Sequence, residues 1–230
     1  MKIVLLPGMD GSGDLFTDFV RALPGELETV IVRYPSDVYL SYPELMEFVK
    51  SGTPDRDPFV LVAESFSTPL AIQFAATVPA NLKGLILCAG FASCPVRNWL
   101  RSTALLLAPV LFLIKLPRFA ATFWLVGSTA PSRLPLDVAA AISSVRPKVL
   151  SARLRAVFRC DVRMELNRID LPILYIQAKQ DRLISASALE EMRQIKPQSS
   201  VVTIPGPHLI FQREPQKTAE IVARFVSRFS

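Results

Sequence analysis

One serine lies where the chain could make it a nucleophile. The run Phe59–Ala63 is short and apolar, as a strand buried on both faces should be, and a helical pattern begins just after Ser65. A sharp turn from strand to helix would hold Ser65 in a strained backbone conformation, which requires small residues two positions away on either side. Ala63 and Ser67 meet this requirement. The turn would present the hydroxyl above a helix N-terminus, which favours negative charge.

A serine hydroxyl needs a base to attack near neutral pH, and the chain contains a single histidine. His208 closely follows the apolar run Val201–Ile204 and precedes the last helical pattern. A lone histidine is commonly structural or exposed, but the loops that follow the strands of a parallel sheet converge on one edge. We therefore predict that His208 takes the proton of Ser65.

A carboxylate must then hold the histidine in one tautomer and stabilise its charged form. Asp181 follows the run Ile173–Gln177 by a few residues and so belongs to the same edge; its alternative role is a turn residue or helix cap. Asp170 precedes that run and would lie at the opposite edge, and Asp161 lies in a long basic segment. We expect Asp181 to be the third residue, since one helix, one strand and two short loops fit between it and His208.

A glycine-rich loop follows the first apolar run, Lys2–Leu6. It reads Pro-Gly-Met-Asp-Gly-Ser-Gly over residues 7–13, and its glycines allow the backbone to fold tightly beside the nucleophile. We expect the backbone N–H groups of Met9 and Phe66 to form an oxyanion hole there. A phosphate-binding loop is the alternative, but the spacing is not G-x-G-x-x-G and no Gly-Lys-Ser/Thr follows.

Short apolar runs alternate with helical patterns along most of the chain. This alternation predicts an α/β fold with a mostly parallel sheet of about six strands, flanked by helices. The predicted strands are Lys2–Leu6, Thr29–Arg33, Phe59–Ala63, Gly84–Cys88, Ile173–Gln177 and Val201–Ile204. The predicted helices are Phe16–Leu23, Glu44–Lys50, Thr68–Thr77, Ala186–Ile195 and Gln216–Arg228.

The alternation stops between Phe91 and Asp170. About 80 residues there have helical periodicity and no clear strand, which is too long for an ordinary connection. We therefore expect a core formed by residues 1–90 and 171–230, with a helical insertion over residues 91–170. The stretch from Trp99 to Val126 is rich in large apolar residues, which pack the insertion onto the sheet or line a pocket for a hydrophobic acyl group.

These motifs together resemble the α/β-hydrolase family over nearly the whole chain. The glycine loop, the turn at Ser65, the insertion, Asp181 and His208 follow one another in that family's order. The resemblance implies that the insertion is a lid over the acyl pocket and that the Met9 and Phe66 amides bind the oxyanion. The motifs look like those of small bacterial esterase or thioesterase-type members, and plastid acyltransferases have a similar opening loop.

Two features depart from the family pattern. The usual G-x-S-x-G reads Ala63-x-Ser65-x-Ser67, so the resemblance depends on the whole set of motifs. The chain also opens at what resembles the family's third strand, so we expect a minimal sheet that lacks the first two.

The composition excludes several classes of protein. With 230 residues, half of them hydrophobic, the chain suits one globular domain and is not intrinsically disordered. Three cysteines without a Cys-x-x-Cys pair, and one histidine, favour neither a disulfide framework nor a zinc site, so we expect no metal and no organic cofactor. The apolar run over residues 102–114 is too short to span a bilayer, the N-terminal run is too short for a signal peptide, and we expect a cytoplasmic protein.

Positive charge is concentrated in the predicted insertion. Residues 91–168 contain 12 Lys and Arg against 3 Asp and Glu, whereas the net charge of the whole chain is +6. This is either an ordinary solvated basic surface or a patch for an acidic partner: a carrier protein, a phosphate-bearing acyl group or an anionic membrane surface. No basic stretch is interleaved with aromatic residues, so we expect no binding of nucleic acid.

These observations predict a serine hydrolase that cleaves carboxylic esters or thioesters of a hydrophobic acyl group, through an acyl-enzyme on Ser65. The first alternative is an acyltransferase that passes the same acyl group to an alcohol. The second is a non-catalytic protein of this fold that binds a hydrophobic ligand or partner, which ligand-induced thermal stabilisation without turnover would indicate.

Overall fold

A single parallel sheet forms the centre of the molecule. The computed structural model describes residues 1–95, 125–127 and 133–229. The strand order is β2-β1-β3-β4-β5-β6, and every neighbouring pair is parallel, so the predicted six-stranded α/β sheet is confirmed. The strands are β1 (Lys2–Leu6), β2 (Glu28–Ile31), β3 (Phe59–Glu64), β4 (Leu82–Cys88), β5 (Ile173–Ala178) and β6 (Ser200–Ile204).

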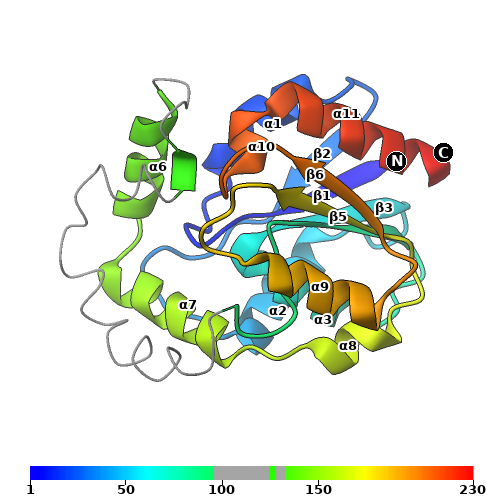
Figure 1. The fold of residues 1–230 in the computed structure, drawn as a ribbon, viewed down its shortest axis with the longest axis horizontal. Coiled ribbons are helices and arrows are strands. Elements are labelled where there is room, and N and C mark those ends of the chain that lie inside the picture. The colour runs from blue at the N-terminus through cyan, green and yellow to red at the C-terminus, as the bar shows by residue number, and fades with distance from the viewer. Residues whose placement is uncertain (96–124, 128–132, 230) are drawn as a thin grey trace.

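Helices cover both faces of this sheet (Figure 1). Side chains alternate between the faces along each strand, so Ile3 and Leu5 pack with one layer while Val4 and Leu6 pack with the other. The first layer contains α1 (Thr17–Ala22), α10 (Ile210–Arg213) and α11 (Pro215–Val226). The second contains α2 (Tyr42–Gly52), α3 (Thr68–Ala75), α8 (Arg163–Arg168) and α9 (Ala186–Ile195).

The centre and the edge of the sheet differ in burial. All six residues of β3 are buried, because strands and helices surround it on every side. In β6, by contrast, only Ile204 is buried, and the other four residues are at least partly exposed. The predicted strands match the observed ones to within two residues at each end.

The predicted helices are also present, with different ends. A capping box between Ser41 and Glu44 makes α2 begin at Tyr42, two residues before the predicted start. The helix predicted from Phe16 begins instead as a 3-10 turn, η1 (Asp14–Phe16), and α1 follows it. A second 3-10 turn, η4 (Ser227–Phe229), ends the last helix.

The described part of the predicted insertion is helical and packs beside the core. It contains α6 (Leu134–Ser143), α7 (Pro147–Arg159) and α8, and Figure 1 shows α6 and α7 to one side of the sheet. An isolated antiparallel bridge joins Ser93, near the start of the insertion, to Asp161, which lies between α7 and α8. Most of the apolar stretch from Trp99 to Val126 lies outside the described residues. Among the helices described, none combines the length and hydropathy needed to cross a bilayer.

Candidate active site

Ser65 lies on a sharp turn between β3 and α3. Its φ angle is 49°, in the left-handed region that residues other than glycine rarely adopt, as the sequence predicted. A short 3-10 turn, η2 (Ser65–Ser67), joins the strand to the helix, and Pro69 lies in the first turn of α3. The turn therefore lifts the Ser65 hydroxyl out of the sheet at the carboxyl end of a central strand.

The residues that depart from the family pattern are accommodated at this turn. Ala63 is fully buried, and the buried Ser67 hydroxyl donates a hydrogen bond to the Pro7 carbonyl and lies 2.8 Å from the Tyr34 hydroxyl. A glycine could form neither contact. Ser67 therefore ties the turn at Ser65 to the glycine loop after β1.

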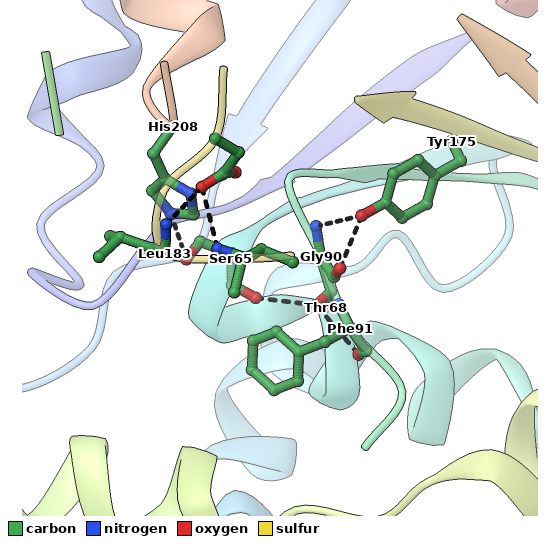
Figure 2. Close-up of polar contacts among 9 residues, drawn as sticks. Ser65, Thr68, Gly90, Phe91, Tyr175, Leu183 and His208 are labelled. Atoms are coloured by element: carbon green, nitrogen blue, oxygen red, sulfur yellow. Dashed lines mark hydrogen bonds and ion pairs between the residues drawn. The ribbon is translucent and has the colours of Figure 1, made fainter. Parts of the chain in front are cut away.

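Further hydrogen bonds hold the turn against the segment after β4 (Figure 2). The Thr68 hydroxyl donates to the Ser65 carbonyl at 2.8 Å and accepts from the Phe91 amide at 3.2 Å. The Tyr175 hydroxyl of β5 donates to the Gly90 carbonyl at 2.6 Å and accepts from the Gly90 amide at 3.0 Å. Thr68 therefore ties the strained turn at Ser65 to the segment after β4, and Tyr175 fixes that segment from β5.

His208 lies within hydrogen-bonding distance of Ser65, although 143 positions separate the two in the chain. The distance from His208 Nε2 to Ser65 Oγ is 2.7 Å, and the His208 side chain is 4% exposed. His208 Nδ1 lies 2.8 Å from Asp181 Oδ2. Because a carboxylate only accepts, Nδ1 carries the proton, and Nε2 accepts the hydrogen bond that the Ser65 hydroxyl donates.

Asp181 also fills the alternative role considered from the sequence. Its Oδ1 accepts hydrogen bonds from the amides of Leu183 and Ile184, both at 2.9 Å, so it shapes the turn after β5 as well as contacting His208. The loops after β5 and β6 are joined by the Gln180 amide, which donates to the Gly206 carbonyl at 2.9 Å. These contacts hold the Asp181 side chain at 5% exposure beside the imidazole.

The other acids weighed from the sequence lie elsewhere. Asp161 forms an ion pair with Arg163 at 2.6 Å, and the exposed Asp170 precedes β5. Within the residues that the structure describes, no group of three or more His, Cys, Asp or Glu side chains could bind a metal ion.

A second buried carboxyl, that of Glu64, interacts electrostatically with His208. Glu64 ends β3 and is 2% exposed, and Gln212 donates a hydrogen bond to it at 3.1 Å. Burial raises the pKa of Glu64 to about 7, although the charge of His208 and the hydrogen bond from Gln212 lower it. Sequence reasoning assigned Glu64 no role. The available signal was a carboxylate at the end of an otherwise apolar strand.

Two opposing effects set the pKa of His208. Burial lowers it, whereas the charge of Asp181, the hydrogen bond to Asp181 and the charge of Glu64 raise it. Together the three raising effects are larger, so the pKa of His208 is above its ordinary value. An imidazole in this setting accepts a proton readily, as a general base should.

The glycine loop after β1 lies beside the turn at Ser65. In the parallel register Leu6 pairs with Ala63, so the residues after β1 continue next to those after β3, where Phe66 follows Ser65. Gly11 and Gly13 have φ angles of 72° and 73°, the left-handed conformation that favours glycine. The structure thus places Met9 and Phe66, the predicted oxyanion residues, on adjacent loops at one end of the sheet.

Sequence reasoning also missed Arg153 of α7. Its guanidinium donates hydrogen bonds to the carbonyls of Met9 at 2.8 Å and Asp10 at 3.0 Å. The available signal was its position: it lies four residues from Val149 and from Val157, on the buried face of an amphipathic helix. A charged residue at such a position is rarely an ordinary surface residue.

The chain is similar to proteins of one known family. The profile of the Alpha/beta hydrolase family matches residues 3–221, while no protein of curated function matches. Similar solved structures include a hydrolase from Oleispira antarctica (14% identity, TM-score 0.81, 99% of this chain and 90% of that chain covered). A second is the enol-lactonase from Burkholderia xenovorans LB400 (15% identity, TM-score 0.79, 98% of this chain and 91% of that chain covered). A third is a thermophilic esterase from Thermogutta terrifontis (19% identity, TM-score 0.77, 99% of this chain and 90% of that chain covered). The fold and the match over nearly its whole length place this chain in the alpha/beta hydrolase family.

Proposed function

We propose that the protein is a serine hydrolase that cleaves carboxylic esters or thioesters of a hydrophobic acyl group. The observation that carries this proposal is the unbroken hydrogen-bond path from Ser65 through His208 to Asp181, at 2.7 and 2.8 Å. Such a path lets a serine hydroxyl pass its proton to histidine while it attacks a carbonyl.

In this mechanism the Ser65 oxygen attacks the acyl carbon while His208 Nε2 takes the hydroxyl proton. Asp181 stabilises the imidazolium, and the N–H groups of Met9 and Phe66 donate to the negative oxygen of the tetrahedral intermediate. The imidazolium then protonates the departing alcohol or thiol, which leaves the acyl group on Ser65. A water molecule, deprotonated by the same histidine, releases the acid and restores the serine.

Apolar side chains next to the histidine support a hydrophobic acyl group. Leu209 packs with Val126, Leu134 and Val138 in a small apolar cluster, and its amide donates to the Leu125 carbonyl at 3.2 Å. Many further large apolar residues lie between positions 99 and 126 of the sequence. An apolar pocket beside the Leu209 cluster would favour acyl chains of medium or greater length.

Two arginines of α7, Arg155 and Arg159, support an acidic carrier protein as the source of that acyl group. Arg155 and Arg159 line a groove of about 250 Å³ together with Tyr39, Ala152 and Ala156, and none of the described residues that line it is acidic. The Tyr39 side chain is 42% exposed. A groove with two guanidinium groups and an exposed aromatic ring suits an acidic protein surface.

The direct test is Ser65→Ala, assayed on a series of p-nitrophenyl esters and thioesters of increasing acyl length. We expect kcat to fall by at least about 10⁴-fold, because the nucleophile is lost. A fluorophosphonate probe should label the wild type once, at Ser65. Ser51→Ala, at an exposed serine of α2, is the matched control and should keep full activity.

Full activity of Ser65→Ala, or labelling of another residue, would rule out the proposal. Adding alcohols separates hydrolysis from acyl transfer, because a transferase would form ester in preference to free acid. Thermal stabilisation by acyl ligands without turnover on any ester would instead indicate a binding protein.

A further inference from the structure

Arg153 is the largest fully buried side chain in the described part of the chain, at 1% exposure. It projects from the face of α7 that also buries Val149, Leu150 and Val157. Removing a guanidinium from water is strongly unfavourable unless its N–H groups find acceptors. Its acceptors therefore explain why a helix of the insertion carries this cation inward.

Three backbone carbonyls accept hydrogen bonds from Arg153. Nη1 donates to Met9 at 2.8 Å and to Asp10 at 3.0 Å, and Nη2 donates to Pro35 at 2.8 Å. Met9 and Asp10 belong to the loop after β1, whereas Pro35 belongs to the loop after β2. A planar guanidinium can fix several acceptors at once in one geometry, which a flexible ammonium group cannot do as well.

Arg153 also lies next to the second expected oxyanion residue. Its guanidinium carbon is 5.8 Å from the centroid of the Phe66 ring and 5.8 Å from that of the Tyr34 ring. Met9, for its part, packs against the cluster that contains Val149 and Leu150. One cation therefore touches both residues whose amides would bind the oxyanion.

The glycine loop leaves space for this side chain. A Cβ atom at Gly11 would lie 2.8 Å from Arg153 Nη1, closer than real contacts allow, and the φ angle of Gly11 is +72°. The Gly11 carbonyl accepts a hydrogen bond from the Tyr34 amide at 2.8 Å. The loop after β1 thus folds around the guanidinium at a glycine.

We propose that Arg153 is a positioning residue that holds the Met9 amide in place for the oxyanion and so couples α7 to the catalytic step. This inference rests on the proposed function. The hydrogen bonds to the carbonyls of Met9 and Asp10 fix the peptide groups that follow the Met9 N–H. The hydrogen bond to the Pro35 carbonyl anchors the guanidinium to a second loop. Displacement of α7 would withdraw these bonds and release the Met9 amide from its position.

Substituting Arg153 tests the proposal. We expect Arg153→Met to lower kcat by about 100-fold, because all three hydrogen bonds are lost. Arg153→Lys should lower kcat by about 10-fold, because an ammonium group keeps the charge but not the planar set of N–H donors. KM should change by less than about threefold, because the oxyanion forms only in the transition state. The inhibition constant of a trifluoromethyl ketone, which forms an oxyanion adduct with Ser65, should rise in proportion to the loss of kcat/KM.

Arg146→Met is the matched control, since it removes an exposed arginine directly before the same helix, and its kcat should stay at the wild-type value. Thermal unfolding shows whether each variant is folded, and if Arg153→Met does not fold, Arg153→Lys decides alone. A kcat within about twofold of wild type, or a loss confined to KM, overturns the inference.

The same assay separates this inference from the proposed function. If Ser65→Ala keeps its activity, the proposed function fails. If Ser65→Ala abolishes activity while Arg153→Lys keeps kcat and binds the ketone as the wild type does, the serine mechanism stands and only the role of Arg153 fails.

Discussion

The ends of the strands and the helical insertion contribute to the site in different ways. Ser65, Asp181 and His208 follow β3, β5 and β6, and their side chains contact one another directly. The insertion reaches the same place through Arg153, whose hydrogen bonds go to backbone carbonyls rather than to those side chains. We expect that changes at the strand ends abolish the reaction or shift its pH dependence, whereas changes in the insertion reduce its rate or restrict its substrates.

Apart from the loss of Ser65 itself, the largest effect should come from Asp181→Asn. Without the carboxylate, His208 loses the partner that fixes its tautomer and stabilises its charge, so kcat should fall by about 10⁴-fold. The amide oxygen of asparagine can still accept from Leu183 and Ile184, so the turn should be kept. Steady-state kinetics on a p-nitrophenyl ester measure the effect.

Asp170→Asn is the control for this change, because it alters an exposed acid before the same strand. A loss of less than about tenfold in Asp181→Asn would mean that this carboxylate only shapes the turn, and that the contrast between strand ends and insertion is wrong.

A second effect should appear in the pH dependence of Glu64→Gln. The pKa of Glu64 is raised by burial to about 7, so its ionised form destabilises the folded state, and this penalty grows as pH rises from about 4.5 through 7. Glutamine cannot ionise. The free energy of unfolding should therefore increase by about 3 kcal/mol at pH 8 and hardly at all at pH 4, as measured by denaturant titration.

The same substitution should alter catalysis in a defined direction. The charge of Glu64 raises the pKa of His208, so its removal should move the acid limb of the kcat/KM profile to lower pH. Glu220→Gln, at an exposed position of α11, should change neither property. An equal gain in stability at both pH values, or a limb that moves to higher pH, would contradict the coupling between Glu64 and His208.

The smallest effect should be specific to a carrier-linked substrate. If Arg155 and Arg159 bind an acidic carrier protein, replacing both with glutamine should lower kcat/KM for the carrier-linked acyl group by about tenfold at low salt. Activity on a small ester should not change. Raising the salt concentration should remove the advantage of the wild type, and equal salt dependence for both substrates would exclude the carrier.

Much of the architecture could be predicted because it follows local patterns. Buried parallel strands are short apolar runs, and the order of strand, serine and helix sets the turn at Ser65 without any long-range information. The pairing of Asp181 with His208 could be inferred because each residue follows a strand of the same sheet. That rule places residues at one edge, while the distances between them come only from the structure.

The roles of Arg153 and Glu64 were missed because they depend on distant contacts. Arg153 and Met9 are 144 positions apart, and in the sequence Arg153 is one of 12 basic residues of the insertion. The contact made by Ser67 could not be predicted for the same reason. Its departure from glycine is visible in the sequence, but the carbonyl of Pro7 that it binds is 60 positions away.

The exposed edge of the sheet determines which part of the site unfolds first. β6 pairs only with β5 in the described sheet and carries His208 on the loop that follows it, whereas Ser65 directly follows the buried strand β3. Opening of an edge strand requires less free energy than global unfolding. Mild heating or denaturant should therefore detach the imidazole first, so that the protein becomes reversibly inactive while most of its secondary structure persists.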